Sequence, residues 1–231
     1  MTRDAARDRA RDGERDAARG GAAGLDAAFV VRWLTAAAAA VEREAGRLTE
    51  LDSAIGDADH GANLRRGFRA VAEALAKDPP ETPGAVLALA GRTLVSTVGG
   101  ASGPLYGTLL RRTGRELGDA AARVSTAEFA AALAAGVAAV GTLGGSAPGD
   151  KTMLDALVPA AGALPGSFDA ARRAAAEGAL ATVPMRARRG RASLLGDRSI
   201  GHQDPGAASS ALLITALAET AADTAAGSAD G

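Results

Sequence analysis

The amino-acid sequence predicts an all-α protein: an eight-helix antiparallel up-and-down bundle or barrel. Eight segments carry apolar residues at spacings of three, four and seven, which is the pattern of one buried helix face. No segment shows a convincing alternation of apolar and polar residues, as a half-buried strand would. Of the 231 residues 47% are apolar but only 3% aromatic, so the core must consist of Ala, Leu and Val, whose small size lets helices approach closely.

The first of four N-terminal helices is expected to begin near Leu25, and segments that contain proline or glycine are expected to separate the four. Their expected positions are Leu25 to at least Val41, then Asn63–Ala76, Pro83–Thr97 and Pro104–Leu117. Asp78-Pro79-Pro80 ends the second helix, because proline cannot continue a helix. Pro104 suits the first turn of the fourth, where its missing N–H has no partner to lose.

The last four helices follow the same logic. Ser125 and Glu128 have the spacing of a capping box, so a fifth helix begins there, with Phe129, Leu133 and Val137 on one side. The remaining helices are expected at about Thr152–Leu164, Phe168–Arg186 and Pro205–Thr224. Residues 1–23 alternate Arg, Asp and Ala without an apolar face, which predicts a disordered or low-complexity tail before one helical domain at 24–231.

Composition argues against several classes of function. The net charge is −1, from 26 basic and 27 acidic residues, so we expect no nucleic-acid partner. The absence of cysteine excludes disulfides, thiolate catalysis and Cys-ligated zinc. No secretory leader or membrane-spanning segment is evident, and the longest early apolar stretch, Leu34–Val41, is far too short to cross a bilayer. A cytoplasmic protein that binds no membrane is expected.

Four polar, glycine-rich segments follow the first, third, fifth and seventh helices. In an up-and-down bundle alternate connections lie at the same end, so these segments should converge into one composite site. The segments are Gly56–Gly61, Gly99–Gly103, Gly141–Gly149 and Gly190–Gly206.

The first of these segments is acidic. Asp52, Asp57 and Asp59 lie within eight residues, and three such charges would repel one another unless a hard divalent cation with oxygen ligands, such as Mg²⁺, lay between them. An acidic surface turn is the alternative. An EF-hand is excluded, because Gly61 occupies the third ligand position of that loop.

The other three segments suit an anion. Gly99–Gly103 precedes a helix and offers backbone N–H groups, although a flexible connector would look similar. Gly144–Thr152 is close to a phosphate-binding P-loop, but Asp150 interrupts the motif and no strand precedes it, so a P-loop NTPase is rejected. The fourth segment is locally basic around Arg191, which favours phosphate, with a solvated basic loop as the alternative.

Together these motifs resemble the L-subunit family of dihydroxyacetone kinases (DhaL). The resemblance covers about Leu25–Thr220, and four motifs carry it in the same order: Gly56–Gly61, Gly99–Pro104, Pro148–Met153 and Gly190–Gly206. It implies an eight-helix barrel with ADP or ATP and Mg²⁺ in the loops at one end. The implied metal ligands are Asp52, Asp57 and Asp59. The implied nucleotide-binding residues are His60, Gly61, Ala62, Asn63, Ala101, Ser102, Gly144, Met153, Arg191, Asp204, Pro205 and Gly206.

The resemblance also implies a reaction. The nucleotide passes its γ-phosphoryl group to dihydroxyacetone, or a similar small ketose, held on a separate K subunit, and a phosphocarrier M subunit of the phosphotransferase system rephosphorylates the bound ADP. Arg191 is the expected catalytic residue, with Arg198 and Lys151 as further candidates for offsetting phosphate charge.

Several alternatives stay open at this point. The chain could serve a free-ATP-dependent kinase for another triose or tetrose, or a fatty-acid-kinase-like system. It could also be a non-catalytic, nucleotide-dependent regulatory adaptor, or a structural bundle. The sequence leaves a homodimer open as well.

Overall fold

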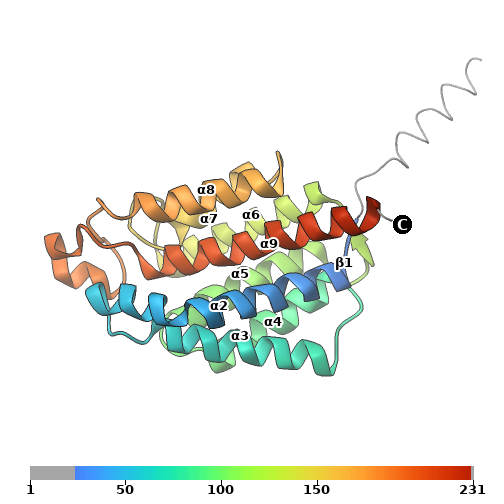
Figure 1. The fold of residues 1–231 in the computed structure, drawn as a ribbon, viewed down its shortest axis with the longest axis horizontal. Coiled ribbons are helices and arrows are strands. Elements are labelled where there is room, and N and C mark those ends of the chain that lie inside the picture. The colour runs from blue at the N-terminus through green and yellow to red at the C-terminus, as the bar shows by residue number, and fades with distance from the viewer. Residues whose placement is uncertain (1–23, 230–231) are drawn as a thin grey trace, which may run out of the picture.

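The computed structural model describes residues 24–229, and this part of the chain is almost entirely helical (Figure 1). Within it lie eight α-helices, one 3-10 helix and two strands of two residues each, which confirms the all-α class. Residues 1–23, where a tail is expected, lie outside the described part. The elements in order are β1 (Leu25–Asp26), α2 (Ala27–Ile55), α3 (His60–Lys77), α4 (Pro83–Thr97), α5 (Ser102–Leu117), β2 (Arg123–Val124), α6 (Thr126–Gly144), α7 (Leu154–Ala163), α8 (Phe168–Ala181), η1 (Arg191–Ser199) and α9 (Pro205–Ala229).

The eight α-helices close into a ring. Each helix packs against the next one along the chain, and α9 packs against α2 as well as α8. Successive helices run in opposite directions with their long axes roughly aligned (Figure 1). The expected antiparallel up-and-down barrel is therefore present.

Some helix boundaries agree with the sequence pattern and others differ. The bounds of α4 match the prediction, and Ser125 and Glu128 form the predicted capping box at the start of α6. By contrast, α3 begins at His60 and α5 at Ser102, earlier than the apolar pattern indicates. Both early turns consist of polar or small residues, which carry no periodic apolar signal.

The short strands were not predicted. Leu25 pairs with Val124 and Asp26 with Arg123 in an antiparallel register. This pairing fixes the start of α2 beside the start of α6, where Asp26 also caps α2 by accepting a hydrogen bond from the Phe29 N–H at 2.8 Å. Two residues are too few to show the period-two pattern by which a strand is recognised in a sequence.

Aromatic side chains make contacts between helices on different sides of the ring. Trp33 of α2 is fully buried, meets Phe129 of α6 edge-on at 5.7 Å between ring centroids, and donates its indole N–H to the Leu213 carbonyl of α9 at 2.9 Å. Among the described residues, one helix, α6, is long and apolar enough to cross a membrane by length and composition. Its Phe129 and Leu133 side chains pack inside the barrel, as those of a core helix do.

Glycine allows α4 and α5 to approach closely. A methyl group placed on Gly91 of α4 would lie 2.7 Å from the carbonyl oxygen of Gly107 on α5, and one placed on Gly107 would lie 2.8 Å from that of Gly91. Because these carbonyl oxygens are backbone atoms, which cannot move aside as a side chain can, the helices would have to separate to admit either methyl group.

We therefore predict that Gly91→Ala lowers the free energy of unfolding by about 1–3 kcal/mol, because overpacking must be relieved by shifting a helix. Gly46→Ala is the matched control. Gly46 also lies inside a helix, α2, but no atom of residues 24–229 lies within 4 Å of the added methyl group. This control should raise stability by roughly 0.5–1 kcal/mol through helix propensity. Urea denaturation of both variants measures the difference, and equal effects would contradict the packing account.

Candidate functional site

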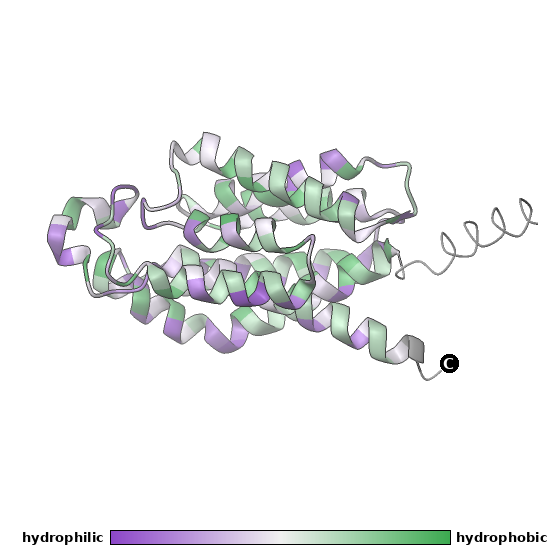
Figure 2. Ribbon diagram, turned by 90° about the horizontal axis from the view of Figure 1, so that it is seen from above, coloured by the Kyte–Doolittle hydropathy of each residue, from purple (hydrophilic) through white to green (hydrophobic). Residues whose placement is uncertain are grey.

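A cavity of about 480 Å³ lies at one end of the barrel, and all four glycine-rich connections contribute to its lining. They are the connections α2–α3, α4–α5, α6–α7 and α8–α9, as the up-and-down topology predicts. In Figure 2 these loops lie at the end of the barrel away from the C-terminus and include several hydrophilic stretches. The volume is within the range of small-molecule sites.

The same topology places four helix N-termini at this end, those of α3, α5, α7 and α9. A helix N-terminus carries a partial positive charge and unpaired N–H groups, so it favours anions. At α5 the capping position is Ala101, whose side chain offers no acceptor to these N–H groups. Because the C-termini of α2, α4, α6 and α8 lie at the same end, the preference for an anion is local to individual N-termini such as that of α5.

Three carboxylates gather at one side of the cavity. Each of Asp52, Asp57 and Asp59 offers an oxygen atom, and these atoms lie within 4.8 Å of one another. Asp52 is buried at the end of α2 and is held in place, because its Oδ2 accepts the backbone N–H of Asp59 at 2.9 Å and of His60 at 3.1 Å. Three closely spaced carboxylate oxygens are the donor set of a hard divalent cation, so these residues fit Mg²⁺.

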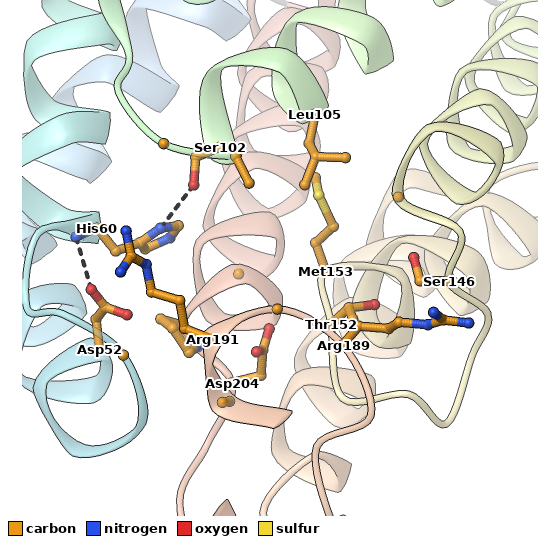
Figure 3. Close-up of a pocket in the computed structure, with 18 of the residues that line it drawn as sticks. Asp52, His60, Ser102, Leu105, Ser146, Thr152, Met153, Arg189, Arg191 and Asp204 are labelled. Carbon is orange, nitrogen blue, oxygen red and sulfur yellow. Dashed lines mark hydrogen bonds between the residues drawn. The ribbon is translucent and has the colours of Figure 1, made fainter. Parts of the chain in front are cut away.

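His60 connects this cluster to the floor of the cavity. Its Nδ1 lies 3.1 Å from the Ser102 hydroxyl (Figure 3). Its Nε2 lies 2.9 Å from the Ser209 hydroxyl, which in turn lies 2.7 Å from the Tyr106 hydroxyl. Burial lowers the pKa of the His60 imidazole and raises the pKa of Tyr106 to about 12. Both rings are therefore neutral near pH 7 and act here as hydrogen-bonding groups that fix Ser102.

Asp204 lies at the start of α9 with its side chain buried. Its Oδ2 accepts the Ala207 N–H at 2.7 Å, which caps the helix. Burial raises the pKa of Asp204 to about 7; the nearby Asp155 and Asp52 carboxylates add to the rise, while the Ala207 N–H and the Lys151 ammonium oppose it.

An arginine-bearing segment, residues 182–202, spans the α8–α9 connection. We call it the arginine arm. Arg189, Gly190, Arg191 and Ala192 all line the cavity. Arg191 Nη2 lies 2.9 Å from Asp57 Oδ2, so the arm reaches the carboxylate cluster, and Arg189 Nε lies 3.6 Å from Asp150 Oδ2 on the α6–α7 connection.

The opposite side of the cavity has an apolar wall. Leu105 and Met153 line it, and Figure 3 shows the Ser146, Thr152 and Arg189 side chains on the same side of the site. Val140 and Leu143 extend this wall from the end of α6. The cavity thus combines a charged side with an apolar side, as a ligand with a charged group and a flat apolar group requires.

Most of the residues expected in the site line this cavity. They are Asp52, Asp57, Asp59, His60, Ala101, Ser102, Gly144, Met153, Arg191, Asp204, Pro205 and Gly206. Gly61, Ala62 and Asn63 do not line it, and neither does Arg198. Gly61 packs against the α2 backbone, and Asn63 accepts a hydrogen bond from Arg66 at 2.8 Å. Direct contact of these three with a nucleotide stays a prediction.

Of the apolar wall, sequence reasoning singled out Met153 but not Leu105, Val140 or Leu143, and it did not single out Arg189. Leu105, Val140 and Leu143 continue the apolar face of their helices, so nothing in the periodicity separates them from core residues. The one feature of the sequence that could have indicated these three residues is their position, since each lies within one helical turn of a glycine-rich connection.

Comparison with known proteins relates the chain to one family. The DAK2 domain matches residues 54–219. The chain is 42% identical over 199 residues to the ADP-binding subunit DhaL of the PEP-dependent dihydroxyacetone kinase of Escherichia coli, covering 82% of this chain and 94% of that protein. A second DhaL protein, from Listeria innocua, is 39% identical over 206 residues, which cover 84% of this chain and 95% of that one.

Longer kinases also contain a matching region. The L-erythrulose 1-kinase of Mycolicibacterium smegmatis is 41% identical over 188 residues, 77% of this chain and 32% of that enzyme. Among solved structures, the dihydroxyacetone kinase from C. freundii in complex with AMP-PNP and Mg²⁺ superimposes with a TM-score of 0.69 at 30% identity, covering 87% of this chain. This chain spans about a third of the length of that C. freundii enzyme, 34%.

The raised pKa of Asp204 predicts how stability varies with pH. Between about pH 4, the ordinary carboxyl pKa, and pH 7 the folded state holds a proton that the unfolded state has lost. Stability should therefore fall as the pH rises through this window, by a few kcal/mol at most, since one unit of pKa difference is worth ~1.4 kcal/mol.

Asp204→Asn keeps an oxygen that can accept the Ala207 N–H but cannot titrate. Urea denaturation of both proteins at several pH values tests the assignment. The stability of the unsubstituted protein relative to Asp204→Asn should decrease from pH 4 to pH 7. A constant difference across this range would show that Asp204 titrates at its ordinary pKa.

Proposed function

Since this chain belongs to the DAK2 family of dihydroxyacetone kinase L subunits, we propose that it is the nucleotide- and magnesium-binding subunit of a dihydroxyacetone kinase. In this proposal the bound nucleotide donates its γ-phosphoryl group to dihydroxyacetone, or a similar small ketose, held by a separate K subunit. The chemistry is phosphoryl transfer to an alcohol.

The observation that carries the proposal is the division of the cavity into a carboxylate side and an apolar side. The carboxylates of Asp52, Asp57 and Asp59 suit a divalent cation, and the nearby N-terminus of α5, which has no side-chain cap, suits phosphate groups. Across the cavity, Leu105 and Met153 offer an apolar surface for a nucleobase. A nucleoside diphosphate has both kinds of group.

The residues of the chain act mainly by position and charge. A divalent cation held by the three aspartates would neutralise charge that builds on the phosphates during transfer. Arg191, beside Asp57, is placed to offset charge on the same phosphates and is our proposed catalytic residue. The N–H groups at the N-terminus of α5 orient the phosphates. No nucleophile on this chain is required.

The proposed partners follow from the relatives. Two of the DhaL proteins are subunits of PEP-dependent kinases, and another, from Lactococcus lactis, is 36% identical and belongs to a PTS-dependent kinase. We therefore propose a K subunit as the acceptor partner and a phosphotransferase-system M subunit as the protein that regenerates ATP from bound ADP. Such partners place this subunit in the cytoplasm.

A second candidate is a kinase for a four-carbon ketose. Its support is the 41% identity to the L-erythrulose 1-kinase of M. smegmatis, which is close to the identity with DhaL of E. coli. Incubating the chain with ATP, Mg²⁺ and a purified K subunit, with dihydroxyacetone or erythrulose supplied separately, distinguishes the two. Phosphorus NMR of the products identifies the sugar phosphate, and no product with either sugar would refute both candidates.

The metal assignment predicts the effect of one substitution. Asp57→Asn removes one carboxylate from the cluster while keeping its size, so the gain in ADP affinity that Mg²⁺ provides should fall at least tenfold, or ~1.4 kcal/mol. Without Mg²⁺ the affinity should not decrease, because the substitution also frees Arg191 from its ion pair with Asp57. Isothermal titration calorimetry with ADP, with and without Mg²⁺, measures both values.

The control is Asp78→Asn. Asp78 ends α3 at the far end of the barrel and does not line the cavity. The Asp78→Asn substitution should leave the ADP affinity unchanged both with and without Mg²⁺. A folded Asp57→Asn protein with undiminished magnesium dependence would exclude Asp57 as a ligand.

A further inference from the structure

The chain uses lysine at two positions only. Of its 26 basic residues, 24 are arginine and the lysines are Lys77 and Lys151. Lys77 is exposed at the end of α3, whereas Lys151 is 1% exposed in the α6–α7 connection. Lysine is among the residues least often fully buried, so this position requires a specific reason.

The Lys151 ammonium lies within a cage of backbone carbonyl oxygens. It donates to Thr182 O at 2.8 Å, to Met185 O at 3.1 Å and to Ser199 O at 2.8 Å, and it also donates to His202 O. An ammonium group has three N–H bonds, so four acceptors use all of them. Although Lys151 borders the cavity, it has no N–H left for a phosphate oxygen.

The four carbonyls occupy the two ends of the arginine arm. Thr182 and Met185 lie where the arm leaves α8, and Ser199 and His202 lie where it returns toward α9. Both ends of the arginine arm are therefore hydrogen-bonded to the Lys151 ammonium, which belongs to the α6–α7 connection. One backbone hydrogen bond also closes the base of the arm, from Gly201 N–H to Val183 O at 2.8 Å.

The backbone conformation at Lys151 directs its side chain into the cage of carbonyl oxygens. Lys151 has a φ of 61°, in the left-handed region that costs free energy for a residue with a Cβ. The conformation is held by Asp155, which accepts the N–H groups of Gly149 and Thr152 on its two oxygens. In addition, the Asp150 carbonyl accepts the Arg188 N–H of the arm at 3.0 Å.

We propose that Lys151 is a positioning residue: it holds the arginine arm over the cavity so that Arg191 faces the carboxylate cluster, and it does not itself contact the nucleotide. This inference rests on the proposed function for its readout, ADP binding. It corrects the expectation that the Lys151 charge offsets that of the phosphates directly. A compact ammonium fits a cage of carbonyls, whereas the planar guanidinium of arginine would not, which gives a physical reason for a lysine in a chain that otherwise uses arginine.

A double-substitution cycle tests whether Lys151 acts through Arg191. Lys151→Met removes the ammonium and keeps an unbranched side chain, and Arg191→Gln removes the guanidinium at the site. If Lys151 only positions the arm, each single variant should weaken ADP–Mg²⁺ binding about tenfold, and the double variant should be no weaker than either. Lys77→Met is the control and should bind as the unsubstituted protein does.

Two results of the cycle would overturn the proposal. Losses that multiply in the double variant would show that Lys151 and Arg191 contact the ligand independently. Unchanged affinity in a folded Lys151→Met protein would show that the cage supports the fold without positioning the arm.

A second measurement needs no substitution. With ¹⁵N-lysine labelling the protein has two side-chain ammonium groups, so its NMR spectrum should contain one protected signal from Lys151, while the exposed Lys77 exchanges rapidly with water. The Lys151 signal should stay protected, without coupling to phosphorus, when ADP and Mg²⁺ are added. Loss of protection would show that the cage opens when the nucleotide binds, and a coupling to ³¹P would establish direct contact. Either result would refute the positioning role.

If the unsubstituted protein binds no nucleotide, the proposed function fails. The protected Lys151 signal in the free protein would still show that the carbonyl cage is formed. Failure of the proposed function can therefore be distinguished from failure of the positioning role.

Discussion

Close packing of neighbouring antiparallel helices determines where everything else in this chain lies. Glycine at contacts such as Gly91 and Gly107 lets the backbones approach, and the ring closes where α9 meets α2. Once the helices alternate in direction around a closed ring, four connections and four helix N-termini must lie at one end. The site is thus a consequence of topology, assembled from residues that lie as far apart in the sequence as Asp52 and Gly206.

Electrostatic balance at that end follows from the same arrangement. The helix N-termini favour anions, yet Asp52, Asp57 and Asp59 place three negative charges beside them. In the structure one cation, Arg191, pairs with Asp57 at 2.9 Å. A divalent cation among the carboxylates would release Arg191 toward phosphate, so metal and nucleotide binding are expected to depend on each other. Lys151 adds a second positive charge at this end, but four backbone carbonyls accept its N–H groups, so none is left for a phosphate oxygen.

The sequence was sufficient to predict the helical class, the convergence of four connections and the capping box at Ser125, because each leaves a local or periodic signal. It did not predict the early start of α3 at His60, where polar residues form the first turn. The sequence also did not predict the apolar wall at Leu105 or the cage around Lys151. Both depend on which residues meet across the ring, and a carbonyl cage involves backbone atoms that every residue possesses.

The central claim is that one end of this barrel holds a nucleoside diphosphate together with a divalent cation. Native mass spectrometry tests it most directly, on the protein as purified and again after addition of ADP and Mg²⁺, each before and after chelation. We expect a mass increase equal to one ADP and its metal, which chelation reduces. A folded protein that stays bare in the presence of ADP or ATP with Mg²⁺ would contradict it.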